Sequence, residues 1–406
     1  MKEKKPIDGK TWEANINKAI DLINSSNSFL FSGDIDPDSV GSMLSLSLYL
    51  NQLDKEVFII ITEPLRGNLD FFEKIIQYNS IRILRTPEEI DTVRNYIDMV
   101  IFCDTANTKL VPLYSQISNY ILSKKPNVVE IDHHFGADSE ELTDYGIKLF
   151  RKANANTEII GEILEMLYDK NPERPNPFGQ RNIILGLITG ILGDTTGGKV
   201  IHYKEDYNRW MGKLEEQLKS ITRWRNSADN KRIEDCRTSK FGDPTQILDY
   251  LNKVTRDQES ILKSLNSHIE SKGNTGFLSL LPSTYQKVNR TWSSIESEWF
   301  FDIMGLLLSS VPEKSGYVGV IIFEGKNAAG ENCVFIKIRR AINFSGIDLR
   351  TAEGKIKELF GNLYMGGGGH AGAVSFRIHR LDEKELLAQL ENLFRFLNGV
   401  IDLNGK

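Results

Sequence analysis

Residues 28–42 have the sequence SFLFSGDIDPDSVGS. Residues 28–32 form a nearly apolar run of the kind found in a buried β-strand, and residues 40–51 have the pattern of a helix. The loop between the two segments carries carboxylates at alternate positions, which are Asp34, Asp36 and Asp38. A strand, an acidic loop and a helix in this order predict the start of a βαβ unit with a ligand site where the strand ends.

Further strand-like segments follow up to about residue 200. They cover residues 57–61, 99–103 and 128–131, and helical sequence separates them. We therefore predict an α/β domain built on a parallel sheet. Ligands bind outside the carboxyl ends of the strands in such sheets. Asp104 comes directly after one of these segments, and the run Asp132-His133-His134 follows another.

The chain of 406 residues is long enough for two domains. Residues 1–202 form the predicted α/β domain, and residues 203–275 have the charge and period of a helical connector. Residues 276–406 contain β-rich runs, a Gly-rich loop and a last helix, so they predict a smaller mixed α/β domain. Trp292 and Trp299 lie near its start, and a place in the core is the favoured prediction for them.

Composition narrows the class of protein. The three cysteines are far apart without a CxxC spacing, which argues against a disulfide framework or a cysteine-ligated zinc site. A net charge of −5 argues against a protein that coats long nucleic acid, but it allows a local basic patch for a short phosphorylated substrate. The N-terminus resembles no signal peptide, and no run approaches the ~18 apolar residues of a membrane span. We expect a cytoplasmic protein with no membrane partner. Its oligomeric state stays open, with a homodimer as one option.

The acidic loop admits two interpretations. Clustered carboxylates repel each other unless a cation lies among them, and hard divalent cations prefer such oxygen ligands. The alternative is a solvated turn that caps the following helix, with Asp38 or Ser39 as the N-cap residue.

The histidine pair favours a site more strongly. Imidazole is a frequent metal ligand, and a neighbouring carboxylate such as Asp132 fixes its tautomer. Asp104 and Asp194 each follow or end an apolar segment. Asp104 could be a metal ligand or a helix cap. Asp194, if buried, would need a partner for its charge.

The order and spacing of these residues resemble the four motifs of the DHH phosphoesterase family, which includes RecJ-type exonucleases, oligoribonucleases and cyclic-dinucleotide phosphodiesterases. The segment at 365–373, with Gly367, Gly368, Gly369 and His370, resembles the GGGH motif of the DHH-associated substrate-binding domain. The resemblance covers about residues 28–200 and 275–380.

The resemblance implies two metal ions bridged by Asp104. Asp36 would bind the first ion, and Asp38, His133 and Asp194 would bind the second. His134 would contact the scissile phosphate, with Asp132 orienting the histidine pair. Manganese suits this mixed shell best, with Mg²⁺ or Co²⁺ as alternatives.

The chain departs from the family pattern at one position. The family usually has a histidine four residues before the first aspartate of its first motif, where this chain has Ser32. Serine is a poor ligand for a divalent ion, so Asp34 or water would take its place, or the first site would be weak or empty.

The second domain would bind the substrate. Consecutive glycines let a backbone approach an anion closely, and arginine binds phosphate oxygens in pairs. In the family an arginine follows the corresponding strand and contacts phosphate; Arg340 is the better match, and Arg339 is the alternative.

These observations predict a manganese-dependent phosphoesterase for a short nucleotide. Its substrate would be a diribonucleotide, a cyclic or linear dinucleotide, or a nucleoside 3′,5′-bisphosphate. Two alternatives stay open: a hydrolase of pyrophosphate or polyphosphate, and a nucleotide-binding regulator with a weakened metal site.

Overall fold

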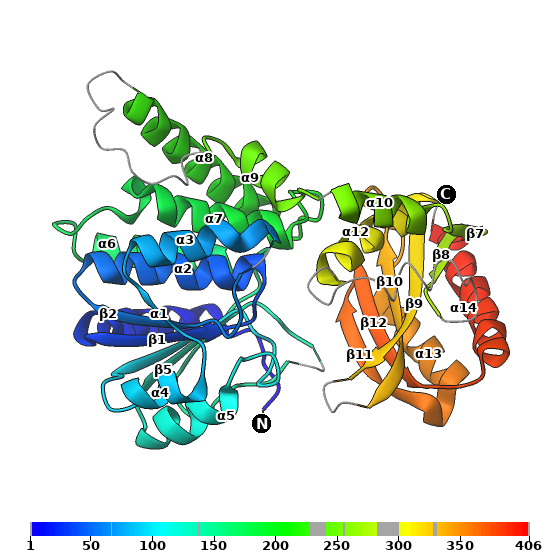
Figure 1. Ribbon diagram of the computed structural model, residues 1–406, viewed down its shortest axis with the longest axis horizontal. Helices are drawn as coiled ribbons and strands as arrows, with labels where there is room; N and C mark the ends of the chain where they lie inside the picture. Colours follow the sequence, from blue (N-terminus) through cyan, green and yellow to red (C-terminus); the bar gives the residue numbers. More distant parts are fainter. Residues whose placement is uncertain are drawn as a thin grey trace. The chain divides into compact units, whose positions relative to one another are not determined.

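The computed structural model describes residues 2–65, 67–136, 139–226, 241–254, 256–281, 300–327 and 331–404. These residues form two compact units, Met1–Lys253 and Val254–Lys406 (Figure 1). Of the predicted connector, α8 (Lys204–Asn226) and α9 (Pro244–Leu251) belong to the first unit and α10 (Arg256–Asn266) to the second. Trp292 and Trp299 lie outside the described residues.

A parallel sheet of six strands forms the centre of the first unit, as predicted. Its strand order is β3-β2-β1-β4-β5-β6, and every neighbouring pair is parallel. The strands are β1 (Ser28–Gly33), β2 (Glu56–Ile60), β3 (Arg82–Leu84), β4 (Met99–Cys103), β5 (Asn127–Asp132) and β6 (Ile147–Phe150).

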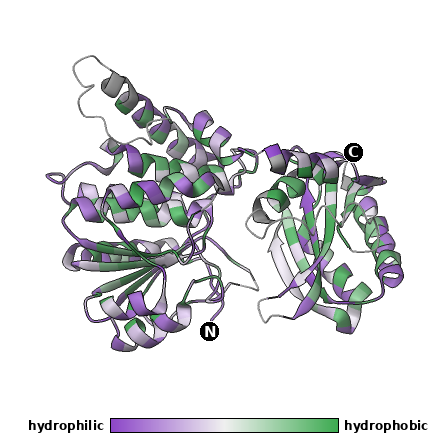
Figure 2. Ribbon diagram, in the orientation of Figure 1, coloured by the Kyte–Doolittle hydropathy of each residue, from purple (hydrophilic) through white to green (hydrophobic). Residues whose placement is uncertain are grey.

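Alternation along the strands divides the apolar side chains between two cores. On β1, Phe29 and Phe31 join one buried cluster and Leu30 joins the other. The larger cluster packs against helices on one side, while α4 (Pro87–Val93) and the π-helix Ile117–Ile121 cover the opposite side (Figure 1). The helices of the larger cluster include α1 (Gly9–Ser25), α2 (Pro37–Gln52), α3 (Asp70–Tyr78), α6 (Asn156–Asp169) and α7 (Arg181–Asp194). Full burial of each such side chain contributes roughly 1.5–3 kcal/mol to the free energy of unfolding. Packing on both faces therefore holds the sheet, and with it the edge that carries the acidic loops, in a fixed position. Hydrophobic residues, drawn in green, occur along the strands and along the helices that pack on them (Figure 2).

The first acidic loop leads directly into a helix. The sequence predicted that this helix covers residues 40–51, but α2 begins at Pro37 and ends at Gln52. The earlier start has a local cause, because Pro37 occupies the first turn and the Asp36 side chain accepts the N–H of Ser39 at 2.8 Å. The N-cap is therefore Asp36 and neither Asp38 nor Ser39.

The second unit contains a mixed sheet of six strands in the order β11-β12-β10-β9-β8-β7. Its β8 and β9 pair in parallel, and the other neighbouring strands are antiparallel. The strands are β7 (Glu270–Lys272), β8 (Thr275–Ser279), β9 (Val318–Lys326), β10 (Asn332–Arg340), β11 (Tyr364–His370) and β12 (Ala373–His379). Helices α13 (Ala352–Phe360) and α14 (Glu383–Asn404) pack on one side, and α10 and α12 (Phe300–Glu313) pack on the other.

The Gly-rich segment forms a strand, and the predicted loop at this position is wrong. Strand β11 lies at the edge of the sheet and pairs with β12. Gly366 and Gly369 have φ angles of 112° and 146°, and a Cβ atom on Gly369 would lie 2.2 Å from the carbonyl oxygen of Ala373. Only glycine fits this conformation and this close approach, so four glycines here make an unusual strand rather than a flexible loop. None of the helices in the described ranges is long and apolar enough to cross a membrane.

Candidate metal centre

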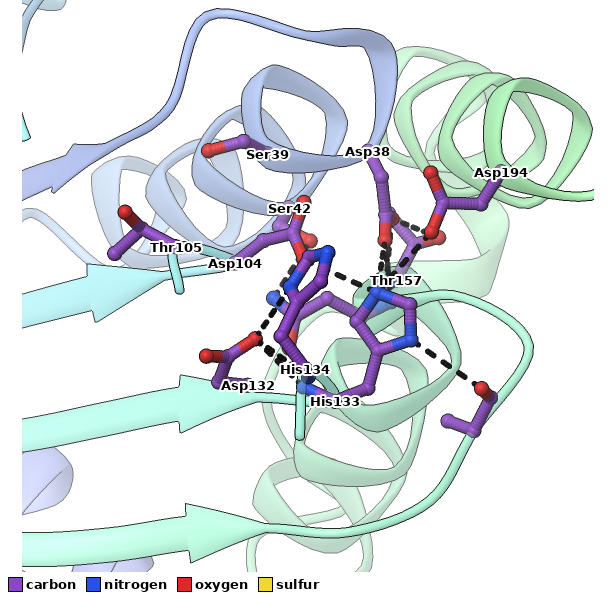
Figure 3. Close-up of polar contacts among 12 residues, drawn as sticks. Asp38, Ser39, Ser42, Asp104, Thr105, Asp132, His133, His134, Thr157 and Asp194 are labelled. Atoms are coloured by element: carbon purple, nitrogen blue, oxygen red, sulfur yellow. Dashed lines mark hydrogen bonds and ion pairs between the residues drawn. The ribbon is translucent and has the colours of Figure 1, made fainter. Parts of the chain in front are cut away.

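Segments far apart in the sequence bring the predicted site residues to the carboxyl edge of the first sheet. Asp38 lies in the first turn of α2, Asp104 follows β4, His133 and His134 follow β5, and Asp194 ends α7. In Figure 3 the side chains of Asp38, Asp194 and His133 point toward one another. Parallel neighbours end at the same sheet edge, which brings Asp38, Asp104 and the two histidines together, and the packing of α7 on α2 places Asp194 beside them.

His133 lies at the centre of the cluster. Its Nε2 is 3.1 Å from Oδ2 of Asp194, 3.2 Å from Oδ1 of Asp104 and 3.7 Å from Oδ2 of Asp38. Its other ring nitrogen, Nδ1, lies 3.2 Å from the carbonyl oxygen of Ala153. A hydrogen bond from Nδ1–H to this carbonyl leaves the Nε2 lone pair directed at the carboxylates, which is the usual arrangement of a metal-binding imidazole.

Asp104 presents a carboxylate without hydrogen bonds. The residue is 1% exposed, and neither oxygen has a hydrogen-bond partner among the described residues. Its backbone has a φ angle of 50°, a left-handed conformation that aspartate tolerates better than most residues, and its N–H donates to the carbonyl of Ile131 at 2.9 Å. A buried carboxylate without hydrogen bonds is costly, so the two free oxygens favour a bound cation.

The carboxylate of Asp38 is held by the beginning of α6. Oδ1 accepts the backbone N–H of Thr157 at 2.9 Å and its hydroxyl at 2.8 Å, and Oδ2 accepts the N–H of Asn156. Helix α6 has no side-chain cap of its own at Ala155, so Asp38 serves as its cap from another helix. The positive end of the helix thereby orients an oxygen of Asp38 toward the cluster.

The crowding of carboxylates raises their affinity for protons. Burial raises the pKa of Asp38 to about 6, and the neighbouring Asp194 adds to this effect. Burial and adjacent carboxylates also raise the pKa values of Asp36 and Asp104 well above the usual range. For His133, burial acts in the opposite direction, but the carboxylates of Asp104 and Asp194 raise its pKa well above the usual value. A divalent cation would relieve this repulsion in place of protons.

Within the part of the chain that the structure describes, two groups of side chains have ligand atoms close enough together to hold a metal ion. One group is Asp38, His133 and Asp194, and the other is Asp104, His133 and His134; within each, the ligand atoms lie within 4.8 Å of one another. The mixture of carboxylate oxygen and imidazole nitrogen suits a divalent transition metal or Mg²⁺. The residues at this edge of the sheet therefore fit a metal ion.

Asp132 orients the histidine pair and is not a member of either group. Its Oδ1 accepts the backbone N–H groups of His133 and His134 at 2.8 and 3.0 Å and lies 2.9 Å from Nδ1 of His134. Burial alone would raise the pKa of Asp132, but the hydrogen bond with His134 and the charge of Lys4 lower it to about 2.

The remaining residues of the first motif lie at the margin of the cluster. Asp36 caps α2, and its charge interacts with those of Asp104 and Asp194. Asp34 accepts the N–H of Ile35 at 2.7 Å, and burial raises its pKa. Ser32 is fully buried, and its hydroxyl has no partner in the described part of the chain.

In the second unit, the two predicted arginines belong to opposite faces of β10. Side chains alternate along a strand, so Arg339 shares the face of Lys337, and Arg340 shares the face of Ile338. The guanidinium of Arg340 donates from Nη1 to the carbonyls of Ser345 and Ile347, at 3.3 and 3.0 Å, and so holds the turn that follows its own strand. Gly367, Gly368 and Gly369 lie within β11, and the side chain of His370 is outside the described residues.

Sequence reasoning did not identify three contributors to the centre, which are Lys4, Ala153 and Thr157. Ala153 acts through a backbone carbonyl, which any residue could supply, and Thr157 resembles any residue of a first helical turn. Lys4 lies in a charged N-terminal segment whose composition is typical of an exposed end. Only the tertiary structure reveals these contacts.

Comparison with known proteins agrees with this architecture. Residues 28–191 match the family described as DHH family, N-terminal domain. An exopolyphosphatase-related protein from Bacteroides fragilis has a similar structure, with a TM-score of 0.66 and 15% sequence identity over 96% of this chain and 98% of that one. RecJ from Thermus thermophilus, solved in complex with Mn²⁺, has a TM-score of 0.50 and 12% identity, covering 97% of this chain and 55% of that one. No curated protein matches significantly.

Proposed function

We propose that the chain is a metal-dependent phosphohydrolase that cleaves a phosphoester bond in a short nucleotide, a proposal that starts from the match of residues 28–191 to the DHH family. The observation that carries the proposal is the pair of unsatisfied groups at the centre of the cluster, the Asp104 carboxylate and Nε2 of His133. Both are buried, and both are directed at the space that Asp38 and Asp194 also border. An orphaned acceptor set of this kind is typical of a site that holds a cation.

Each side chain has a proposed role. Asp38, His133 and Asp194 would hold one divalent ion, Asp104 would be shared with a second ion, and Asp36 and Asp34 would supply oxygen ligands to that second ion. When bound, such ions activate a water molecule at neutral pH and stabilise the charge on the phosphoryl oxygens. Asp132 fixes the ring of His134, and His134 donates a hydrogen bond to the scissile phosphate. Manganese is the favoured ion, because carboxylate and imidazole ligands together suit it, with Mg²⁺ and Co²⁺ as alternatives.

The second unit is proposed to bind the substrate through β10 and the Gly-rich edge strand. Gly367, Gly368 and Gly369 lie on the edge strand β11, where Gly367 is buried and Gly369 is exposed, and His370 follows them. Arg339 is proposed as the phosphate contact because it shares its face of β10 with a second basic residue, Lys337, whereas the guanidinium of Arg340 holds the turn after the strand. A diribonucleotide, a cyclic or linear dinucleotide, or a nucleoside 3′,5′-bisphosphate has the phosphate and the base that such a surface could recognise.

One observation favours a second candidate. Ser32 stands where a nitrogen ligand is expected, and its buried hydroxyl has no partner in the described chain. Hydrolases of pyrophosphate and polyphosphate can also lack that ligand, so a phosphoanhydride hydrolase is the alternative activity. A nucleotide-binding regulator with a weakened metal site is the alternative without catalysis.

A hydrolysis screen with manganese separates these functions. The purified protein is incubated with pApA, cyclic di-AMP, 3′-phosphoadenosine 5′-phosphate, pyrophosphate and polyphosphate, and a chelator-treated sample is the control. The proposal predicts metal-dependent release of product from at least one nucleotide and little from the two anhydrides. Turnover of polyphosphate alone would establish the second candidate. Binding of a nucleotide without any turnover would establish the regulator.

A further inference from the structure

The side chain of Lys4 is almost completely buried, although the residue precedes the first helix. It is 1% exposed, and the residue lies outside the segment 28–191 that matches the family. Backbone hydrogen bonds hold the surrounding residues in place: Lys4 N–H donates to Ser139 at 3.1 Å, and Ile7 N–H donates to Phe150 at 3.1 Å. The N-terminal segment is therefore a fixed part of the first unit, beside the loop that follows β5.

The ammonium group of Lys4 connects two loops of the metal centre. Nζ donates to Oδ2 of Asp132 and to the carbonyl oxygen of Thr105, the residue after Asp104. The ring of Phe150 lies beside it, with its centroid 5.3 Å from Nζ. A single buried cation thus joins the segment after β4 to the segment after β5.

The two oxygens of Asp132 have separate partners. Oδ2 accepts from Lys4, while Oδ1 accepts the backbone N–H groups of His133 and His134 and lies 2.9 Å from Nδ1 of His134. Because both oxygens are committed, Asp132 acts as a fixed acceptor for the histidine pair. A buried carboxylate that loses its cation becomes an uncompensated charge, and the groups around it rearrange to reduce that cost.

We propose that Lys4 positions His134 by way of Asp132. The N-terminal segment 2–7 is then part of the functional site. In this arrangement Lys4 balances the charge of Asp132 and keeps this carboxylate bonded to the histidines. His134 then has a single orientation toward the neighbouring Asp104, whose Oδ1 lies 3.4 Å from its Nδ1. The kinetic part of this inference rests on the proposed hydrolase activity; the structural part does not.

The structural part is tested by hydrogen–deuterium exchange in Lys4→Met, which keeps an unbranched side chain, one atom shorter, and removes its charge. Exchange in a peptide covering 130–136 should become at least about threefold faster, because the N–H groups of His133 and His134 lose a fixed acceptor. A peptide within 204–218 should be unchanged. Lys170→Met is the matched control, since it removes an exposed ion pair with Asp21 and should change neither peptide.

The kinetic part uses a chromogenic phosphodiester and a double-mutant cycle with Asp132→Asn. Lys4→Met should lower kcat about tenfold or more and leave KM and the manganese affinity within about twofold. In the Asp132→Asn background, Lys4→Met should cause no further loss, because the positioning pathway is already interrupted. A role in general stability would instead lower the active fraction and the bound metal together.

Distinct results overturn the two proposals. Unchanged exchange at 130–136 in Lys4→Met, or a full independent loss of kcat in the Asp132→Asn background, would contradict the role of Lys4. If Lys4→Met alone does not fold, Asp132→Asn and the double variant are compared instead, and any difference in exchange at 130–136 between them contradicts it. Absence of hydrolysis in the unaltered protein would contradict the proposed function, and the exchange measurement would still decide the role of Lys4.

Discussion

The hydroxyl and the backbone N–H of Thr157 both donate to Oδ1 of Asp38, at 2.8 and 2.9 Å. One residue at the beginning of α6 therefore fixes the carboxylate of a residue at the beginning of α2. Asp38 caps a helix with the same group that we propose as a metal ligand, so the start of α6 and the metal centre depend on each other.

Removal of the Thr157 hydroxyl should weaken metal binding. We expect Thr157→Val to lower the affinity for manganese by roughly 10-fold or more, because partners that orient a metal ligand typically contribute 10- to 100-fold. Calorimetric titration measures this affinity. Thr143→Val is the matched control: its hydroxyl donates to the buried Glu130 at 2.7 Å, and Glu130 is in neither group of possible metal ligands. Equal affinities for the two variants would show that Thr157 does not orient a ligand.

Metal should stabilise the protein more at neutral pH than in mild acid. Burial raises the pKa of Asp38 to about 6, above the ~3.9 of an unfolded chain. A raised carboxyl pKa stabilises the metal-free fold below about pH 4, and this contribution disappears as the pH rises through about 6. Manganese compensates the same charge and competes with the proton.

The measurement is the rise in Tm that manganese causes at about pH 7.5 and at about pH 5.5. We expect the rise to be greater at the higher pH by several degrees, since 1 kcal/mol shifts Tm by roughly 2–4 °C for a domain of this size. Asp21→Asn, at an exposed position, should leave the difference intact. A larger rise at the lower pH would contradict the account.

The two arginines of β10 should have different roles. Arg339→Ala should raise KM for a nucleotide substrate by roughly 10-fold or more, the effect of losing a hydrogen bond to a charged group, while bound manganese stays unchanged. Arg340→Ala should instead lower the free energy of unfolding, because the carbonyls of Ser345 and Ile347 lose their donor. Steady-state kinetics and denaturant unfolding of both variants test this assignment. The reverse pattern would restore Arg340 as the substrate ligand.

The position of Ser32 predicts one weak metal site. A histidine there would add a nitrogen ligand, so Ser32→His should reach full activity at a lower manganese concentration, provided that its buried position accepts the larger ring. Asp34→Asn should raise the concentration required if Asp34 supplies an oxygen. Manganese titrations of activity compare the three proteins. If the titration curves of both variants coincide with that of the unaltered protein, neither side chain faces the metal.

The parallel sheet and the convergence of Asp38, Asp104 and His133 were predictable from the sequence pattern, whereas Asp194, at the end of a helix, was assigned to the site by the family resemblance. Short apolar runs mark buried strands, and parallel strands bring their carboxyl ends to one edge. The strand at Gly367 was not predictable, because four glycines in a row are typical of a loop and only pairing with β12 makes them a strand. The opposite faces of Arg339 and Arg340 also needed the structure, since the register of β10 decides which face each occupies.

The capping of α6 and the burial of Lys4 are contacts between segments far apart in the chain. Asp38 and Thr157 are separated by 119 positions, and Lys4 and Asp132 by 128. Local patterns carry no information about pairs at such separations. These contacts surround the ligands without belonging to a motif, so the sequence predicts which side chains meet the metal better than it predicts what holds them in place.

The most direct test of a metal centre at this sheet edge is the manganese stoichiometry of Asp104→Asn compared with the unaltered protein. Asparagine tolerates the left-handed backbone at this position, so the fold should persist, and the thermal unfolding curve of the metal-free protein checks this. Equilibrium dialysis followed by elemental analysis then counts the ions. The account predicts close to two manganese ions in the unaltered protein, and at most one, bound more weakly, in Asp104→Asn. Equal manganese content and affinity in the two proteins would contradict it.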